Sequence, residues 1–129
     1  FMCATSCLTS NHRPQRNRRS IRAELFHVNA NIVCCKKPIK SKIRIYKKES
    51  KHGPNSAILF FHQGGFVIMD NKTDDYFCSL LSDKCSSTVI SLNYRLCPEN
   101  NFPAAIDDAF ALWSYVQKNA NFLNIDPKL

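Results

Sequence analysis

The chain has 129 residues, of which 44% are hydrophobic and 22% are charged. This length allows one domain with its own core but not two, and the composition is typical of a folded chain. No apolar run reaches the roughly 18 residues that a transmembrane helix needs. The first ten residues have neither the cationic start nor the apolar centre of a signal peptide, so secretion is not expected.

The net charge of +8 is distributed unevenly along the chain. Residues 36–51 carry eight cationic side chains and one acid, whereas residues 70–129 carry eight acids and five cations. Residues 1–23 contain no acid and five arginines: Arg13, Arg16, Arg18, Arg19 and Arg22. Such a segment is a solvated tail, a transit-like leader or a nucleic-acid arm. The lack of aromatic residues among the arginines favours the solvated tail over an RNA-binding surface.

The chain contains seven cysteines, an odd number. A disulfide framework is typical of shorter, secreted, loop-rich chains, so we expect reduced thiols and a cytoplasmic location. Cys3, Cys7 and His12 are spaced too loosely for a structural zinc site and no CxxC pair accompanies them. We therefore expect no metal and no organic cofactor.

The chain is predicted to divide into two regions. Residues 1–35 read as an irregular basic segment, with a short helix near residues 22–28 as its ordered element. Residues 36–129 read as one α/β unit, because short apolar runs and helical patterns alternate along it.

Two strands are predicted in the first part of this unit. Residues 41–48 alternate, with Ile43 and Ile45 on one face and mostly cationic residues on the other, as in a half-buried strand near a sheet edge. Residues 52–56 (HGPNS) have the composition of a turn. Residues 57–61 are continuously apolar, as in a strand buried on both faces.

Two helical patterns enclose another apolar strand at residues 88–92. Thr73 suits the N-cap of the first helix, whose predicted buried face is Tyr76, Phe77, Leu80 and Leu81. Pro103 suits the first turn of the second helix, whose predicted buried face is Ile106, Ala109, Phe110, Trp113 and Val116 or Tyr115. This alternation predicts an α/β fold with a mostly parallel, doubly wound sheet.

The segment FFHQGGFV, residues 60–67, places two of the chain's three glycines directly after a predicted strand. Ligands bind beyond the carboxyl ends of strands in such sheets. Adjacent glycines leave backbone N–H groups uncovered, as an oxyanion requires. Phosphate is the competing anion, but both G-x-G-x-x-G and G-x-x-x-x-G-K-[ST] are absent. The glycine pair alone leaves open a tight turn without any ligand.

Three motifs occur in order along the chain: HQGGF, then YRLCPE, then FPAAIDD. They resemble the HGGGF, YRLAPE and FPAAxDD motifs of the hormone-sensitive-lipase family of α/β-hydrolases, and the resemblance covers roughly residues 40–129. It implies an α/β-hydrolase fold and hydrolysis of small carboxylic esters through an acyl-enzyme, as in carboxylesterases and lipases.

The resemblance also implies roles for single residues. Gly64 and Gly65 are expected to donate their N–H groups to the oxyanion, while His62 supports the loop and is not the base. Gln63 replaces the family's first glycine, which costs about 1 kcal/mol or more if that position needs a positive φ. The remaining motif positions are expected to be scaffold, with an ion pair between the arginine and the glutamate: Tyr94, Arg95, Pro98, Glu99, Asp107 and Asp108.

The family's serine nucleophile lies in a G-x-S-x-G elbow, followed by an acid and a histidine. Glycines occur only at positions 53, 64 and 65, and no histidine follows residue 62, so these 129 residues contain no Ser-Asp-His triad. We expect either the N-terminal part of a longer carboxylesterase, ending before the nucleophile strand, or a non-catalytic protein. The alternative function is RNA binding or another interaction through residues 13–51.

The 129 residues alone are expected to be inactive and to expose part of their core. We expect no hydrolysis of a short-chain p-nitrophenyl ester above the buffer rate. An unpaired sheet edge is also expected, and such edges promote self-association or aggregation.

Overall fold

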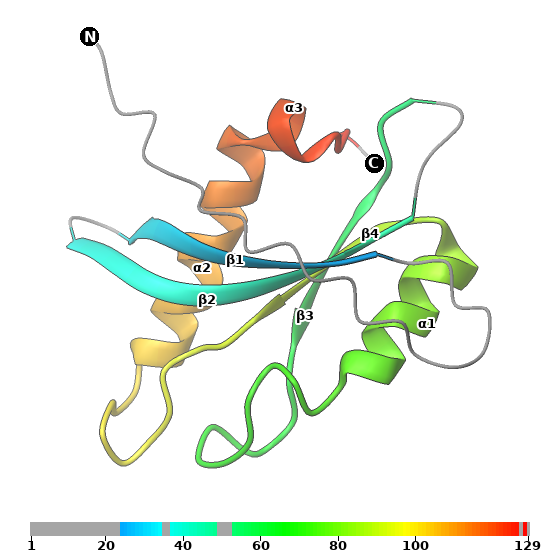
Figure 1. Cartoon of the computed structure of the whole chain (residues 1–129). Helices are drawn as coiled ribbons and strands as arrows, with labels where there is room; N and C mark the ends of the chain where they lie inside the picture. The colour runs from blue at the N-terminus through cyan, green and yellow to red at the C-terminus, as the bar shows by residue number, and fades with distance from the viewer. Residues whose placement is uncertain (1–23, 35–36, 49–52, 127, 129) are drawn as a thin grey trace, which may run out of the picture.

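A computed structural model describes residues 24–34, 37–48, 53–126 and 128 of the chain (Figure 1). The strands form one four-stranded sheet in the order β1-β2-β4-β3. In chain order the elements are β1 (Glu24–Cys34), β2 (Lys37–Lys47), β3 (Ala57–Phe61), α1 (Asp75–Cys85), β4 (Thr88–Leu92), α2 (Ala104–Lys118) and α3 (Ala120–Leu123).

The sheet is mixed. β3 and β4 pair in parallel through the crossover helix α1, whereas β1 pairs antiparallel with β2 and β2 antiparallel with β4. The predicted α/β architecture is therefore confirmed, but this part of the sheet is not mostly parallel. The reason is that β1 and β2 follow each other as a hairpin, and only the β3-α1-β4 unit has the long connection that parallel pairing needs.

The N-terminal prediction is wrong from Glu24 onward. Residues 24–34 form β1, which pairs with β2 along its whole length, where an irregular segment and a short helix near residues 22–28 were expected. Pairing with a neighbouring strand outweighs a weak local pattern of this kind. Residues 1–23, with the arginine cluster, Cys3, Cys7 and His12, lie outside the described residues.

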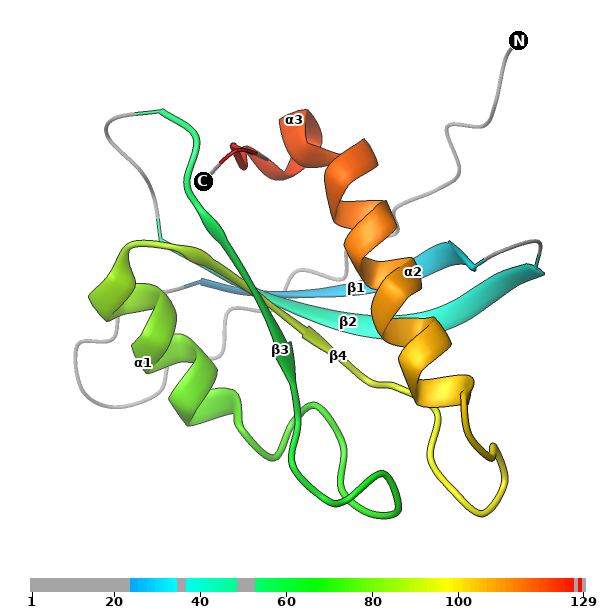
Figure 2. The same cartoon turned by 180° about the vertical axis from the view of Figure 1, so that it is seen from behind.

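Helices cover both faces of the sheet, and α2 passes behind β1 and β2 in Figure 1 and in front of them in Figure 2. On the opposite face, Tyr46, Cys78 and Val89 form a second cluster beneath α1. The main core joins β2 and β4 to α2 through Ile43, Ile45, Ile90, Leu92, Ala111, Leu112 and Val116.

β2 is an interior strand and not the half-buried edge strand predicted. Arg44 and Tyr46 are buried beneath α1, where the Asp75 carboxylate accepts hydrogen bonds from the Arg44 guanidinium (2.5 Å) and the Tyr46 hydroxyl. These bonds compensate for removing polar groups from water. Burial also raises the pKa of the Tyr46 phenol above its ordinary value. β3, predicted to be buried on both faces, is one of the two edge strands, and its residues are half-buried or exposed.

The faces that both helices turn to the sheet agree only in part with the predicted ones: Val116 is buried and Leu81 packs against the core, as expected, but most of the other predicted residues are not buried. On α2, Ile106, Phe110 and Trp113 are 52–61% exposed. The residues of α2 that pack inward are Asp108, Ala111, Leu112 and Val116, and those of α1 are Cys78 and Ser82. Both helices carry apolar residues around much of their circumference, so the pattern alone does not select the buried side. Within the described ranges, no helix has the length and apolarity to cross a bilayer.

The last described residues lie along the outer edge of β3. Asn55 forms a parallel bridge with Ile125. The Asn55 amide donates to the Asn124 carbonyl, and the Asp126 amide donates to the Asn55 carbonyl, both at 3.0 Å. The Ser56 carbonyl points the other way, toward β4. Because backbone groups alternate along a strand, the edge beyond this bridge is formed by the N–H and C=O groups of Ala57, Leu59 and Phe61.

Candidate functional site

The loops that follow β3 and β4 meet at the same end of the sheet, at the bottom of Figures 1 and 2. The first loop covers residues 62–74 and carries the glycine pair, and the second covers residues 93–103. The Cys97 amide donates to the Phe66 carbonyl at 2.8 Å, which joins the two loops directly. The structure thus brings the first two sequence motifs together at the carboxyl ends of the parallel strands.

Gly64 and Gly65 form a tight turn with φ of +127° and +61°. The Gly64 carbonyl accepts hydrogen bonds from the amides of Val67 and Ile68, both at 3.1 Å. A Cβ on Gly64 would lie 2.0 Å from the Ile68 carbonyl oxygen, whereas a Cβ on Gly65 would meet nothing within 4 Å. Position 64 therefore requires glycine both because a Cβ has no room and because φ is positive, whereas position 65 requires glycine only because φ is positive.

The amide N–H groups of the glycine turn take no part in the hydrogen bonding of the described fold. Within the described part of the chain, no group accepts a hydrogen bond from the N–H of Gly64 or Gly65. The Gly65 N–H shares a peptide plane with the Gly64 carbonyl, so the turn that holds this carbonyl also fixes the direction of the N–H. Adjacent backbone donors held in this way are suited to stabilise an oxyanion.

Gln63 does not need a glycine's conformational freedom. Its φ is not positive, so the penalty considered from the sequence does not arise. Its exposed side chain extends along the loop, where Nε2 lies 3.5 Å from Oδ1 of Asp74. Positive φ values occur instead at Phe66 (+66°) and Met69 (+76°). Each costs about 1–2 kcal/mol in a residue with a Cβ, so contacts elsewhere in the loop must offset this strain.

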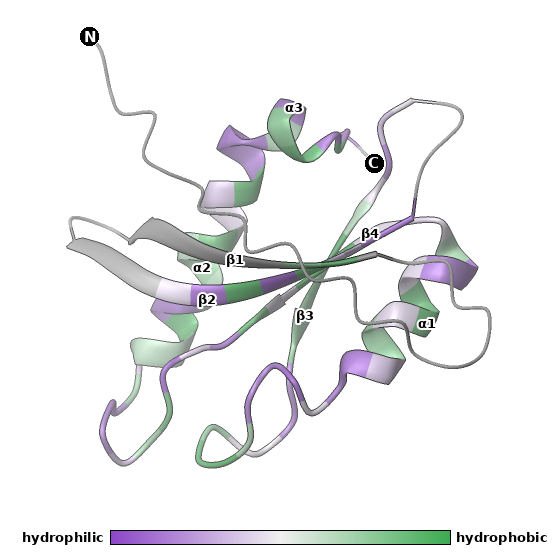
Figure 3. Cartoon of the chain, viewed as in Figure 1, coloured by the Kyte–Doolittle hydropathy of each residue, from purple (hydrophilic) through white to green (hydrophobic). Residues whose placement is uncertain are grey.

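The glycine turn leads into a hydrophobic stretch, visible in Figure 3 in the loop that follows β3. Its four side chains are 45–57% exposed: Phe66, Val67, Ile68 and Met69. The Phe66 ring lies 5.8 Å from the Tyr94 ring. The uncovered N–H groups therefore border an apolar surface.

His62 is 3% exposed and is held from two sides. Its Nδ1–H donates to the Gln63 carbonyl at 2.8 Å, and its ring stacks on Tyr94 with centroids 4.2 Å apart and planes 7° from parallel. The Tyr94 hydroxyl donates to the His62 carbonyl at 2.7 Å. Nε2 of His62 is buried, and no described residue bonds to it. Burial raises the pKa of the Tyr94 phenol above its ordinary value.

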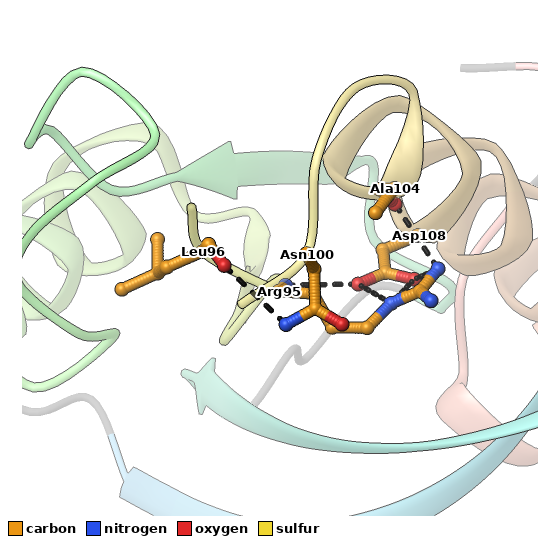
Figure 4. Close-up of polar contacts among 5 residues, drawn as sticks. All are labelled: Arg95, Leu96, Asn100, Ala104 and Asp108. Carbon is orange, nitrogen blue, oxygen red and sulfur yellow. Dashed lines mark hydrogen bonds and ion pairs between the residues drawn. The ribbon is translucent and has the colours of Figure 1, made fainter. Parts of the chain in front are cut away.

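Arg95 and Asp108 fix the second loop to α2 (Figure 4). The Arg95 side chain donates to both oxygens of the buried Asp108 carboxylate, with Nη2 at 2.7 Å from Oδ1 and Nε at 3.1 Å from Oδ2. The Arg95 amide also donates to Oδ2 at 2.9 Å, and Nη2 reaches the Ala104 carbonyl at 3.2 Å. Asn100 caps the loop by donating to the Leu96 carbonyl at 3.3 Å.

The prediction of an ion pair between Arg95 and Glu99 is wrong. Glu99 is exposed and forms no ion pair within the described residues, because α2 brings the Asp108 carboxylate under the loop instead. Asp107, next to Asp108, is half-buried, and its carboxylate bonds to no described group; Pro98 is exposed.

Sequence reasoning missed Asn71, a buried residue that ties the far end of the glycine loop to the sheet. Its amide donates to Oδ1 of Asn93 at 3.3 Å, and its side chain donates to the Lys42 carbonyl at 3.2 Å. A lone asparagine in a predicted loop gives no signal of such a role. In the part of the chain that the structure describes, no three His, Cys, Asp or Glu side chains are grouped to hold a metal.

Comparisons with known proteins agree with this architecture. The sequence model of a family described as "alpha/beta hydrolase fold" matches residues 58–129. The arylesterase of Saccharolobus solfataricus is 39% identical over 84 residues, which are 65% of this chain and 27% of the arylesterase. Probable carboxylesterase 11 of Arabidopsis thaliana is 38% identical over 78 residues, 56% of this chain and 17% of that protein. The chain thus spans about a quarter or less of these relatives.

Solved structures show the same relationship. A bacterial heroin esterase superposes with a TM-score of 0.75 at 30% identity, over 85% of this chain and 34% of the esterase. EstE1, a thermostable carboxylesterase cloned from a metagenomic library, superposes with a TM-score of 0.70 at 35% identity, over 81% of this chain and 34% of EstE1. These similarities confirm the predicted α/β-hydrolase fold.

The substitution Asp108→Asn tests the lock between the second loop and α2. It keeps the shape of the side chain but removes the charge that holds Arg95. We expect the free energy of unfolding to fall by about 2 kcal/mol, as for other hydrogen bonds to charged groups, measured by urea denaturation. Asp107→Asn is the matched control and should change stability by no more than about 0.5 kcal/mol. Equal effects of the two substitutions would refute the lock.

The two glycines should differ in their tolerance of a methyl group. Gly64→Ala should destabilise the chain by several kcal/mol because its Cβ meets the Ile68 carbonyl oxygen. Gly65→Ala should cost only about 1–2 kcal/mol, the penalty of a left-handed residue with a Cβ. Thermal and urea denaturation of both variants would measure the difference, and an equal loss would contradict the described turn.

Proposed function

Because this chain belongs to the α/β-hydrolase fold family, among the esterases similar to hormone-sensitive lipase, we propose that its protein hydrolyses carboxylic esters. In this proposal residues 62–74 form the oxyanion-binding loop. The 129 residues contain no G-x-S-x-G elbow and no histidine after residue 62. In this proposal the nucleophile, acid and base are therefore supplied from outside them, and the chain alone is inactive.

The uncovered N–H groups of Gly64 and Gly65 carry this proposal. When a serine oxygen attacks an ester carbonyl, the C=O double bond opens and the carbonyl oxygen gains negative charge. Two fixed N–H donors stabilise this charge more strongly in the transition state than in the neutral ester. The intermediate then expels the alcohol to form an acyl-enzyme, and water releases the acid. This reaction needs no metal and no organic cofactor.

His62 has a supporting role in this proposal. A general base must reach the proton that it removes. The His62 ring is buried against Tyr94, and its Nδ1–H is already bonded to the Gln63 carbonyl. We therefore assign His62 to holding the loop in shape.

The apolar stretch of residues 66–69 favours a small ester with an apolar group beside its carbonyl, since these exposed side chains border the proposed oxyanion hole. Residues 24–34 and 37–47 take part in the sheet, and within these described residues nothing favours the RNA-binding alternative assigned to residues 13–51. A cytoplasmic location remains part of the proposal and fits the free thiols of Cys78, Cys85 and Cys97.

The outer edge of β3 is proposed as the surface through which this chain associates with another strand. The bridge between Asn55 and Ile125 already occupies the start of this edge in the parallel direction. The outward backbone groups of Ala57, Leu59 and Phe61 continue the same ladder. An edge of this kind pairs readily with a further strand or a second copy of the chain.

A chimera would test the ester-hydrolase proposal. The 84-residue matching segment of the Saccharolobus arylesterase is replaced by its counterpart from this chain, and hydrolysis of p-nitrophenyl acetate is measured. We expect a hydrolytic chimera, whereas Gly65→Pro, which removes one N–H donor and also cannot adopt the φ of +61° found at this position, should lower kcat on the order of 10²-fold or more. Gly65→Ala keeps the donor and should lose less.

Two results would contradict this proposal. One is a chimera that folds, by circular dichroism, but does not hydrolyse the ester. The other is hydrolysis by the isolated 129-residue chain that Gly65→Pro abolishes, which would show that the chain needs no outside nucleophile.

The edge proposal predicts which substitution keeps the chain monomeric. Phe61→Lys places a charge at the open edge of β3 and should lower self-association, measured by sedimentation velocity over a range of concentrations. Phe110→Lys is the matched control, because Phe110 is also exposed but lies on α2. If only Phe110→Lys prevented association, the helix face and not the sheet edge would be the contact surface.

A further inference from the structure

We propose that Tyr94 is a positioning residue for the oxyanion hole, and that its phenol group sets the direction of the Gly64 N–H through His62. This inference deepens the proposed function and rests on it. Neither the family motif nor the sequence pattern assigned Tyr94 more than a scaffold role.

The argument begins with the peptide plane that contains the Gly64 N–H. The bond between Gln63 and Gly64 is trans, so the Gly64 N–H points opposite to the Gln63 carbonyl. The Gln63 carbonyl is held by Nδ1–H of His62 at 2.8 Å. Any rotation of the His62 ring or backbone therefore turns the Gly64 N–H.

Tyr94 controls both the backbone and the ring of His62. Its hydroxyl donates to the His62 carbonyl at 2.7 Å, which fixes the peptide plane between His62 and Gln63. Its ring lies parallel to the imidazole at 4.2 Å, which fixes the ring that reaches the Gln63 carbonyl. One side chain thus holds the two parts of His62 on which the direction of the Gly64 N–H depends.

The Gly65 N–H is held differently, and this provides an internal control. Its peptide plane contains the Gly64 carbonyl, which is bonded to the amides of Val67 and Ile68 within the loop. Loss of the Tyr94 hydroxyl should therefore disturb Gly64 more than Gly65.

Tyr94 is itself rigid enough for this role. It is buried, and it directly precedes Arg95, whose amide and side chain are both bonded to Asp108. Burial raises the pKa of the Tyr94 phenol, so the hydroxyl keeps its proton and remains a donor at the pH of ordinary ester assays.

The first test is Tyr94→Phe in the 129-residue chain, followed by ¹H–¹⁵N NMR. This substitution removes the hydroxyl and keeps the stacked ring. We expect the Gly64 amide resonance to move and its hydrogen exchange to quicken, with a smaller change at Gly65. Tyr115→Phe is the matched control, since it removes a half-buried hydroxyl that bonds to no described group, and should leave both glycines unchanged.

His62→Phe provides a second variant if Tyr94→Phe fails to fold. It keeps an aromatic ring against Tyr94 but removes the Nδ1–H donor, and it should produce the same displacement of the Gly64 resonance. Unchanged Gly64 resonances in the folded variants, or equal changes at Gly64 and Gly65, would overturn the proposal.

The second test is kinetic and uses the chimera. Tyr94→Phe should lower kcat about tenfold with KM changed less than about twofold, because a misaligned donor is lost mainly in the transition state. A purely structural role predicts parallel loss of folded protein with kcat per folded molecule unchanged, and that result would overturn the inference. An inactive parent chimera would refute the ester-hydrolase proposal, while the NMR test would still decide the role of Tyr94.

Discussion

A single buried carboxylate, Asp108 of α2, organises the segment that follows β4. It accepts hydrogen bonds from both the side chain and the backbone amide of Arg95, and so fixes one residue in position and direction. Because Tyr94 is the preceding residue, its ring is held against His62 at the start of the glycine loop. The shape of the candidate oxyanion hole therefore depends on a charge that lies in another element and never contacts the hole.

The glycine loop combines strain with anchoring. Phe66 and Met69 adopt positive φ values that side chains disfavour, and their apolar groups remain largely exposed. The Cys97 N–H donates to the Phe66 carbonyl and the Asn71 N–H donates to Oδ1 of Asn93, and these bonds hold the two ends of this stretch. Such an arrangement keeps the N–H groups of the turn oriented before any substrate arrives, which is the condition under which backbone donors stabilise a transition state most effectively.

Much of this organisation could be predicted from the sequence, and the remainder has identifiable physical reasons. The order from β3 to α2 and the place of the glycine pair follow from short apolar runs, helical spacing and motif order. The buried face of α2 could not be predicted, because Phe110 and Trp113 are as apolar as the residues that pack inward. The interior position of β2 could not be predicted from the sequence, because Arg44 is buried by pairing with Asp75, 31 positions away along the chain. Likewise, only the path of α2 decides that Arg95 pairs with Asp108 and not with Glu99.

The separation between Asp108 and the loop that depends on it also orders events during synthesis. His62 and the glycine pair leave the ribosome well before α2 does, and domains reach their final packing only when the contacting segments are present. Until Asp108 has emerged and bound Arg95, the residue next to Tyr94 lacks the hydrogen bonds that fix it in the folded chain. The nascent chain therefore exposes four apolar side chains in a glycine loop that is not yet fixed, at the stage when chaperones and proteases can bind it.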